Sequence, residues 1–107
     1  MAALDLEDLA FLDANQKERY MALERLFESD GWHIVKAWAD TCCGEALNRI
    51  VNSQSWDQNR VAVGARIAYL HMLNLESATE AEFTQYVEQA KEAKVDAEEA
   101  EDAQDNE

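Results

Sequence analysis

The residues best suited to catalysis or metal binding are two cysteines and two histidines. Cys42 and Cys43 are adjacent, and neighbours on a helix point about 100° apart, so a disulfide between them would need a strained geometry. Metal binding needs converging ligands, usually as a Cys-x-x-Cys or as a histidine pair at helical spacing, and His33 and His71 fit neither pattern. We therefore expect reduced, buried thiols and neither a metal nor another cofactor.

The sequence also lacks the motifs that build an active site. Enzymes need converging groups, such as a nucleophile beside a base or a pair of carboxylates in a pocket. The chain contains no glycine-rich phosphate loop, no Gly-x-Ser-x-Gly and no His-Glu-x-x-His. Its acidic residues fall where helix caps and solvated helix faces are expected. The sequence therefore predicts a protein that is not an enzyme.

All the elements that carry these residues are predicted to be helices. The chain has no proline, and its apolar residues recur at spacings of three and four. We expect helices at 14–28, 32–51 and 57–75 and from 79 onward, after a short N-terminal arm at 4–12. Capping patterns mark their starts: Asp13 with Gln16, Ser29-Asp30-Gly31, Ser55 with Gln58, and Ser77 with Glu80 or Thr79 with Glu82. The expected fold class is all-α, a small helical bundle of three to four helices.

Small residues occupy the middle of the predicted helix 32–51, where Ala39, Cys42, Cys43, Gly44 and Ala46 offer little bulk. A glycine inside a helix costs about 1 kcal/mol relative to alanine. Gly44 is therefore expected either to permit a close helix crossing or to mark a kink.

Hydrophobicity and charge both divide the chain near its end. Of 33 apolar side chains larger than alanine, 28 lie between Leu4 and Leu75, so the core is expected in the first 75 residues. Seven acidic residues and no basic one occur from Asp96 onward. Such a segment buries too little apolar surface to offset its ordering entropy. We expect one helical domain over 1–95 and a flexible acidic tail over 96–107.

The net charge of -14 restricts the partners of the chain. Nucleic acids and anionic membranes are bound through lysine and arginine, so direct contact with either is disfavoured. The most apolar run, Val61–Leu75, is shorter than the roughly 20 residues that span a bilayer. The N-terminal segment has early acids and no basic region before an apolar run, unlike a secretory signal. We expect synthesis in the cytoplasm and no membrane contact.

The segment Val61–Leu75 carries most of the functional information. As a helix it is apolar on most of its circumference, with one polar stripe formed by Arg60, Gly64, His71 and Asn74. A helix that is apolar nearly all round is buried nearly all round. Because a chain of this size has one modest core, two neighbouring helices cannot cover that surface. The sequence therefore predicts self-association or docking on another protein.

Several residues are candidates for this protein interface. A tryptophan buries a large area and keeps one hydrogen-bond donor, so the three tryptophans either cap the core or act as interaction hot spots. The arginines of helix 57–75 can pair with carboxylates and fix the register of two subunits, and His71 is expected as a satisfied interfacial histidine. The predicted interface consists of Trp32, Trp38, Trp56, Arg60, Ala65, Arg66, Ala68, His71 and Met72.

The acidic tail has three alternative roles. It can keep the protein soluble, dock on a basic surface of a partner, or mimic the phosphates of a nucleic acid. Mimicry requires carboxylates at fixed positions, whereas this segment is expected to be mobile.

Five short segments resemble the turn and packing signatures of small helical proteins encoded among the morphogenesis genes of tailed bacteriophages: Arg19-Tyr20, Glu28-Ser29-Asp30-Gly31-Trp32, Ser55-Trp56-Asp57, Asn59-Arg60 and Gly64-Ala65. The resemblance covers roughly residues 9–76 and transfers no catalytic residue. It implies a virion or assembly component, present in the host cytoplasm or the virion, that contacts itself or other virion proteins.

The leading hypothesis is thus a non-enzymatic structural or interaction protein that oligomerises or docks on a larger assembly through helix 57–75. The alternative, which rests on the charge alone, is an acidic inhibitor that mimics nucleic acid. Such an inhibitor would occupy the nucleic-acid site of a host DNA- or RNA-binding protein.

Overall fold

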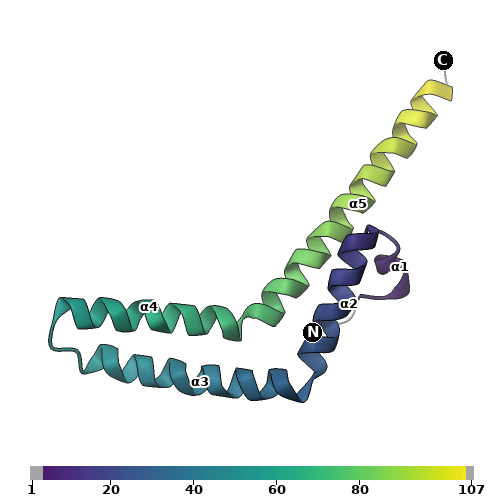
Figure 1. The fold of residues 1–107 in the computed structure, drawn as a ribbon. Helices are drawn as coiled ribbons and strands as arrows, with labels where there is room; N and C mark the ends of the chain where they lie inside the picture. The colour runs from purple at the N-terminus through teal and green to yellow at the C-terminus, as the bar shows by residue number, and fades with distance from the viewer. Residues whose placement is uncertain (1–3, 106–107) are drawn as a thin grey trace. The chain divides into compact units, whose positions relative to one another are not determined.

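The computed structural model describes residues 4–105, which form helices and no strand. The helices follow one another in the order shown in Figure 1: α1 (Leu6–Leu9), α2 (Ala14–Glu28), α3 (Asp30–Val51), α4 (Trp56–Leu73) and α5 (Leu75–Asp105). The predicted all-α class is confirmed for this part of the chain. The predicted helix 14–28 matches α2 at both ends, and the predictions for α3 and α4 are within two residues of their observed bounds.

Side-chain caps explain why three helices begin where the sequence predicted. Asp13 and Gln16 form a reciprocal capping box at α2, in which each side chain accepts a hydrogen bond from the other residue's backbone N–H, at 2.8 and 3.0 Å. The Ser29 hydroxyl accepts from the backbone N–H of Trp32 at 3.1 Å, before α3. Ser55 caps α4 in the same way. These caps satisfy backbone donors that a helix start leaves unpaired.

The last helix begins earlier than predicted, and the Ser77 and Thr79 caps are not used. Asn74 alone separates α4 from α5, with its backbone N–H bonded to the Leu70 carbonyl and its own carbonyl bonded to the N–H of Ala78. Because this single residue ends one helix and starts the next, no linker remains in which Ser77 or Thr79 could cap. Thr79 is instead a buried residue inside α5.

The described chain divides into two compact units. Residues 4–24 and 79–105 form the first, which we call the terminal unit. Residues 25–78 form the second, which we call the hairpin unit. Helices α2 and α5 each continue from one unit into the other.

The core of the terminal unit is formed by residues of α2, of the segment before it and of α5. Its buried residues are Leu12, Tyr20, Phe83 and Val87. The rings of Tyr20 and Phe83 pack edge to face with centroids 5.3 Å apart. The Tyr20 hydroxyl accepts a hydrogen bond from the backbone N–H of Leu4, which holds the segment before α1 against this core. The expectation that the core lies in the first 75 residues is therefore wrong here, because α5 supplies half of it.

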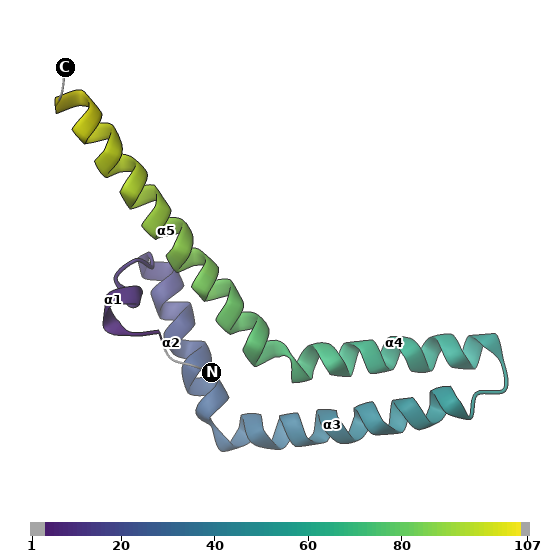
Figure 2. The ribbon, with the colours of Figure 1, turned by 180° about the vertical axis from the view of Figure 1, so that it is seen from behind.

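The hairpin unit consists mainly of α3 and α4, which lie side by side and run antiparallel (Figures 1 and 2). The polar residues 52–55 connect them. Their buried residues are mostly small: Trp32, Ala39, Cys43 and Ala46 on α3 and Ala62 on α4. Small side chains allow two helices to approach closely, but they bury little apolar area. The hairpin unit therefore has a thin core.

The close crossing expected at Gly44 is not found. Gly44 is exposed, and a Cβ atom added there would meet no other group within 4 Å. Helix α3 also continues through this residue without interruption. The small buried residues of α3 are instead Ala39, Cys43 and Ala46.

Gly44→Ala is expected to stabilise the protein by about 1 kcal/mol, because alanine is the better helix former and the space at this position is open. Urea denaturation followed by circular dichroism measures the effect. Gly64→Ala, at a second glycine with open surroundings, provides a matched comparison on α4. A loss of stability in Gly44→Ala would show that another surface approaches this position in solution.

Candidate protein-interaction surface

Ten large apolar side chains are exposed along the two helices of the hairpin, each by between 37% and 74%. They are Ile34, Val35, Trp38, Leu47 and Val51 on α3 and Trp56, Val61, Val63, Ile67 and Leu70 on α4. They are not confined to one face, because Val61 and Val63 lie two positions apart and therefore about 200° apart around α4. Contiguous exposed apolar patches mark sites of protein interaction, so the question is which of these residues share a face.

Four of these residues form a regular row on α4. Trp56, Val63 and Leu70 follow one another at intervals of seven, and Ile67 lies between the last two. A seven-residue interval is close to two helical turns, so the four side chains share one side of the helix. We call these four residues the α4 stripe. Since Val63 directly follows the buried Ala62, the stripe flanks the seam with α3.

The structure gives the nine predicted interface residues different degrees of exposure. Five are exposed on the hairpin: Trp38, Trp56, Arg60, Ala68 and His71. Ala65, Arg66 and Met72 are half-buried on α4. The Trp38 ring packs edge to face against Tyr69 of α4, with centroids 5.7 Å apart, so one edge of this exposed indole is already fixed by the hairpin.

Trp32 differs from the other tryptophans because it is only 6% exposed. Its ring packs against Phe27 with centroids 5.1 Å apart, inside the hairpin unit. The structure thus places Trp32 in the core-capping role that the sequence left open. Its indole N–H and the Nε of Arg66 are buried without a hydrogen-bond partner among the described residues, which is an uncommon state for buried donors.

Charge is distributed very unevenly between the two units. Residues 25–78 contain six acidic and five basic residues, a net charge of -1. The remaining residues contain 17 acidic and four basic ones, a net charge of -13. The centres of protein interfaces are depleted of charged residues. The exposed apolar side chains therefore lie on the part of the chain that another protein can approach with little electrostatic repulsion.

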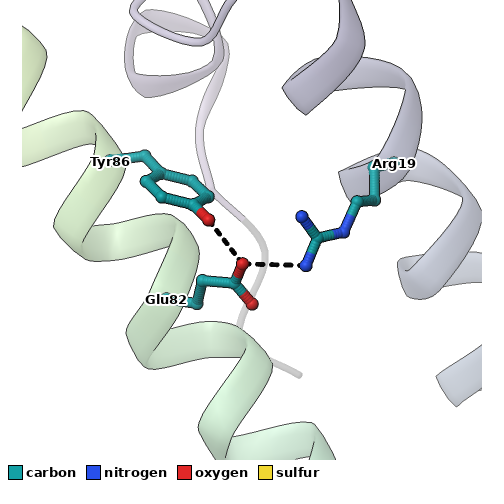
Figure 3. Close-up of polar contacts among 3 residues, drawn as sticks. All are labelled: Arg19, Glu82 and Tyr86. Carbon is teal, nitrogen blue, oxygen red and sulfur yellow. Dashed lines mark hydrogen bonds and ion pairs between the residues drawn. The ribbon is translucent and has the colours of Figure 1, made fainter.

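The terminal unit holds a polar cluster of three residues, which Figure 3 shows. Arg19 on α2 and Tyr86 on α5 both donate a hydrogen bond to the same carboxylate oxygen of Glu82. The bond from Tyr86, and then the one from Arg19, lower the pKa of Glu82. The bond to Glu82 in turn raises the pKa of Tyr86. Near neutral pH the carboxyl stays ionised and the phenol protonated, so this cluster joins two helices and is not poised for proton transfer.

A second ion pair binds α1 to α5, between Lys91 and Asp8 at 3.1 Å. The hydrogen bond that Lys91 donates to the Asp8 carboxylate is the largest of the effects that raise the pKa of Lys91. Both groups are partly solvated, so the pair contributes little to stability by itself. It fixes the short helix α1 in the terminal unit.

Other features of the described residues do not combine into a reactive site. No group of three or more histidine, cysteine, aspartate or glutamate residues within 4–105 is arranged to hold a metal ion. Cys42 and Cys43 are free thiols. A pocket of about 480 Å³ lies at the turn between α3 and α4, and Arg49, Asp57 and Val61 are among its lining residues. None of the helices described is long and apolar enough to cross a membrane.

Sequence reasoning missed part of this surface. Ile34 and Val51, at opposite ends of α3, are 70% and 74% exposed, yet nothing in their spacing separates them from core residues. The neighbour of a helix decides which apolar face is covered, and the sequence does not name that neighbour. The seven-residue interval of the α4 stripe is the one signal that could have been read in advance.

In comparisons with known proteins, no family model, curated protein or solved structure matches the chain. The exposed apolar surface of the hairpin and the separation of charge between the units are therefore the observations on which a function can rest.

Proposed function

We propose that this chain is a non-enzymatic structural or interaction protein that oligomerises or docks on a larger protein assembly through its α3–α4 hairpin. The supporting observation is the exposure of ten large apolar side chains on the two helices. Large apolar side chains exposed on neighbouring helices mark sites of contact with another protein. Helix α4, which corresponds to the predicted segment 57–75, remains the main contact helix, and α3 adds to it.

The thin core of the hairpin gives a second reason for a partner. Among the buried residues of α3 and α4, Trp32 is the only large side chain. The alanines and the cysteine of this seam bury little apolar area toward the entropy of ordering the forty residues of the two helices. Burial of the exposed residues against another protein would supply the missing stabilisation.

In this proposal the assembled protein contains a small bundle of three to four helices, with residues 4–12 as an N-terminal arm and 96–107 as an acidic tail. The tail begins as the end of α5, and residues 96–103 are exposed. Its carboxylates keep the assembly soluble or contact a basic surface. The resemblance to tailed-phage morphogenesis proteins suggests that this chain is a virion or assembly component made in the host cytoplasm. Its partners would then be further copies of itself or other virion proteins.

Sedimentation velocity combined with binding of the dye ANS tests the proposal. We expect species larger than the 12.1 kDa chain or, at dilution, a monomer that binds the dye strongly. A folded monomer that neither associates at high concentration nor binds the dye would contradict the proposal, because its hairpin would then be covered by its own chain.

A second candidate is the acidic inhibitor that mimics nucleic acid. The observation that favours it is the charge of -13 outside the hairpin, together with the 31-residue helix α5, which spaces carboxylates regularly. A rigid helix rises about 1.5 Å per residue and so holds its charges at fixed positions.

Binding of the full chain to purified nucleic-acid-binding proteins of the host tests this second candidate. The inhibitor hypothesis requires binding that weakens with salt, competes with DNA or RNA and is lost when residues 96–107 are deleted. Binding that is insensitive to salt and to this deletion would count against it.

A further inference from the structure

We infer that the partner of the exposed hairpin surface is a second copy of the same hairpin, and that the α4 stripes of the two copies pack antiparallel to form a four-helix bundle. This inference rests on the proposed function and names the partner. It follows from the charge of the hairpin, the spacing of the stripe and the exposure of its residues.

The charge distribution favours a copy of the hairpin over other partners. A basic partner would be attracted to the residues outside the hairpin, which carry -13, and not to the hairpin, which carries -1. Two copies of this chain repel each other wherever the terminal units meet, whereas the hairpins approach with almost no net charge. The apolar surface thus lies on the one unit that can meet its own copy at low electrostatic cost.

The two end residues of the α4 stripe are placed symmetrically about Val63, whereas Ile67 has the polar Asn59 as its counterpart. Trp56 and Leu70 each lie seven residues from Val63. When two such helices pack antiparallel about a two-fold axis through Val63, Trp56 of each copy meets Leu70 of the other. A two-fold interface must be self-complementary in this way, with each contact made twice. A large indole against a medium-sized leucine at both ends fills the space between two helices evenly.

The stripe forms the centre of such an interface, with the exposed fractions of its four residues between 37% and 72%. A standard interface buries about 800 Å² per partner, so residues beside the stripe must also take part. Neighbouring residues of α3 extend the interface. Packing two antiparallel hairpins into a four-helix bundle also gives each thin seam a second layer of core residues.

Ile67→Glu tests the inference, because Ile67 belongs to the stripe but is 49% exposed, so the hairpin of a single chain tolerates a carboxylate there. Sedimentation equilibrium of the full chain is expected to give twice 12.1 kDa for the unmodified protein. Ile67→Glu should weaken the dimer at least about tenfold, since it buries an unpaired charge. Val63→Glu should weaken it similarly. Circular dichroism checks that each variant remains helical.

Asn48→Glu is the matched control. Asn48 is exposed on α3, two positions from the buried Ala46 and therefore about 200° around the helix from it. It adds the same charge to the same hairpin without touching the stripe, so the dimer should persist. Equal weakening by Ile67→Glu and Asn48→Glu would overturn the inference, as would a dimer that survives both stripe variants.

The failure of this inference can be told apart from failure of the proposed function. A wild-type protein that stays monomeric at every concentration, but binds ANS less well after Ile67→Glu, would exclude the self-paired hairpin and leave a surface for another protein. A monomer that binds no dye would contradict both. Salt provides a further sign: screening of the terminal units should strengthen a dimer of this chain, so a dimer weakened by salt would overturn the inference.

Discussion

Phe83→Ala is expected to unfold the terminal unit. Phe83 is fully buried, and its ring packs edge to face with Tyr20 and Tyr86, with centroids 5.3 and 5.5 Å away. The Arg19 guanidinium lies over the same ring, 5.5 Å from its centroid. Removal of a buried phenylalanine ring costs about 3–5 kcal/mol, and this ring holds α2 and α5 together. A small unit has little more stability than that to lose.

Urea denaturation followed by circular dichroism measures the loss. Thr84→Ala is the control, because Thr84 is the exposed neighbour of Phe83 on α5 and its replacement should change stability by less than about 0.5 kcal/mol. A loss below about 1 kcal/mol for Phe83→Ala would contradict the central position of this ring. Hydrogen exchange of the α3 amides then shows whether the hairpin keeps its protection when the terminal unit has opened.

Helix positions could be predicted because their signals are local. The capping box of Asp13 and Gln16 lies within one turn, and α2 begins directly after it. The same kind of pattern failed at Ser77 and Thr79. A cap requires an extended residue before the helix, and Asn74 had already used the only break available. A capping pattern therefore marks a permitted helix start, and the packing around it decides whether it is used.

Tertiary pairing could not be predicted, because periodicity shows the apolar face of a helix and not the neighbour that covers it. Tyr20 and Phe83 each lie on a predicted apolar face, but nothing in their 63-residue separation pairs them. The bond between Arg19 and Glu82 is likewise invisible until α2 and α5 lie together. For the same reason the three tryptophans could not be separated in advance into the buried Trp32 and the exposed Trp38 and Trp56.

Part of the candidate surface could be predicted from the sequence. The segment Val61–Leu75 has too many apolar residues for two helices to cover, and the structure leaves Val61, Val63, Ile67 and Leu70 exposed. On α3 only Trp38 was predicted among the exposed apolar residues, and Ile34, Val35, Leu47 and Val51 were not. The charge distribution gives information that hydrophobicity alone does not. It shows that the hairpin unit, which exposes the apolar residues, has almost no net charge, whereas most acidic residues lie outside it.

Ala46→Leu is expected to open the hairpin and, with it, to abolish the assembly. Ala46 is fully buried on α3, in a seam whose other alanines, Ala39 and Ala62, are almost as inaccessible. Three additional carbon atoms at this position force the helices apart, and overpacking of this kind costs about 1–3 kcal/mol. Because the seam buries so little area, that cost is comparable to the stability that the hairpin has by itself.

Ala37→Leu is the control, since Ala37 is an exposed alanine of α3 and the same change there meets no seam. Thermal unfolding and sedimentation equilibrium should both change for Ala46→Leu and both stay close to the wild type for Ala37→Leu. The comparison with Ile67→Glu is then informative. That variant should lower the affinity between copies with little change in a monomeric hairpin, whereas Ala46→Leu acts on the hairpin first. If Ala46→Leu left the assembly intact, the contact surface would not depend on the pairing of α3 with α4.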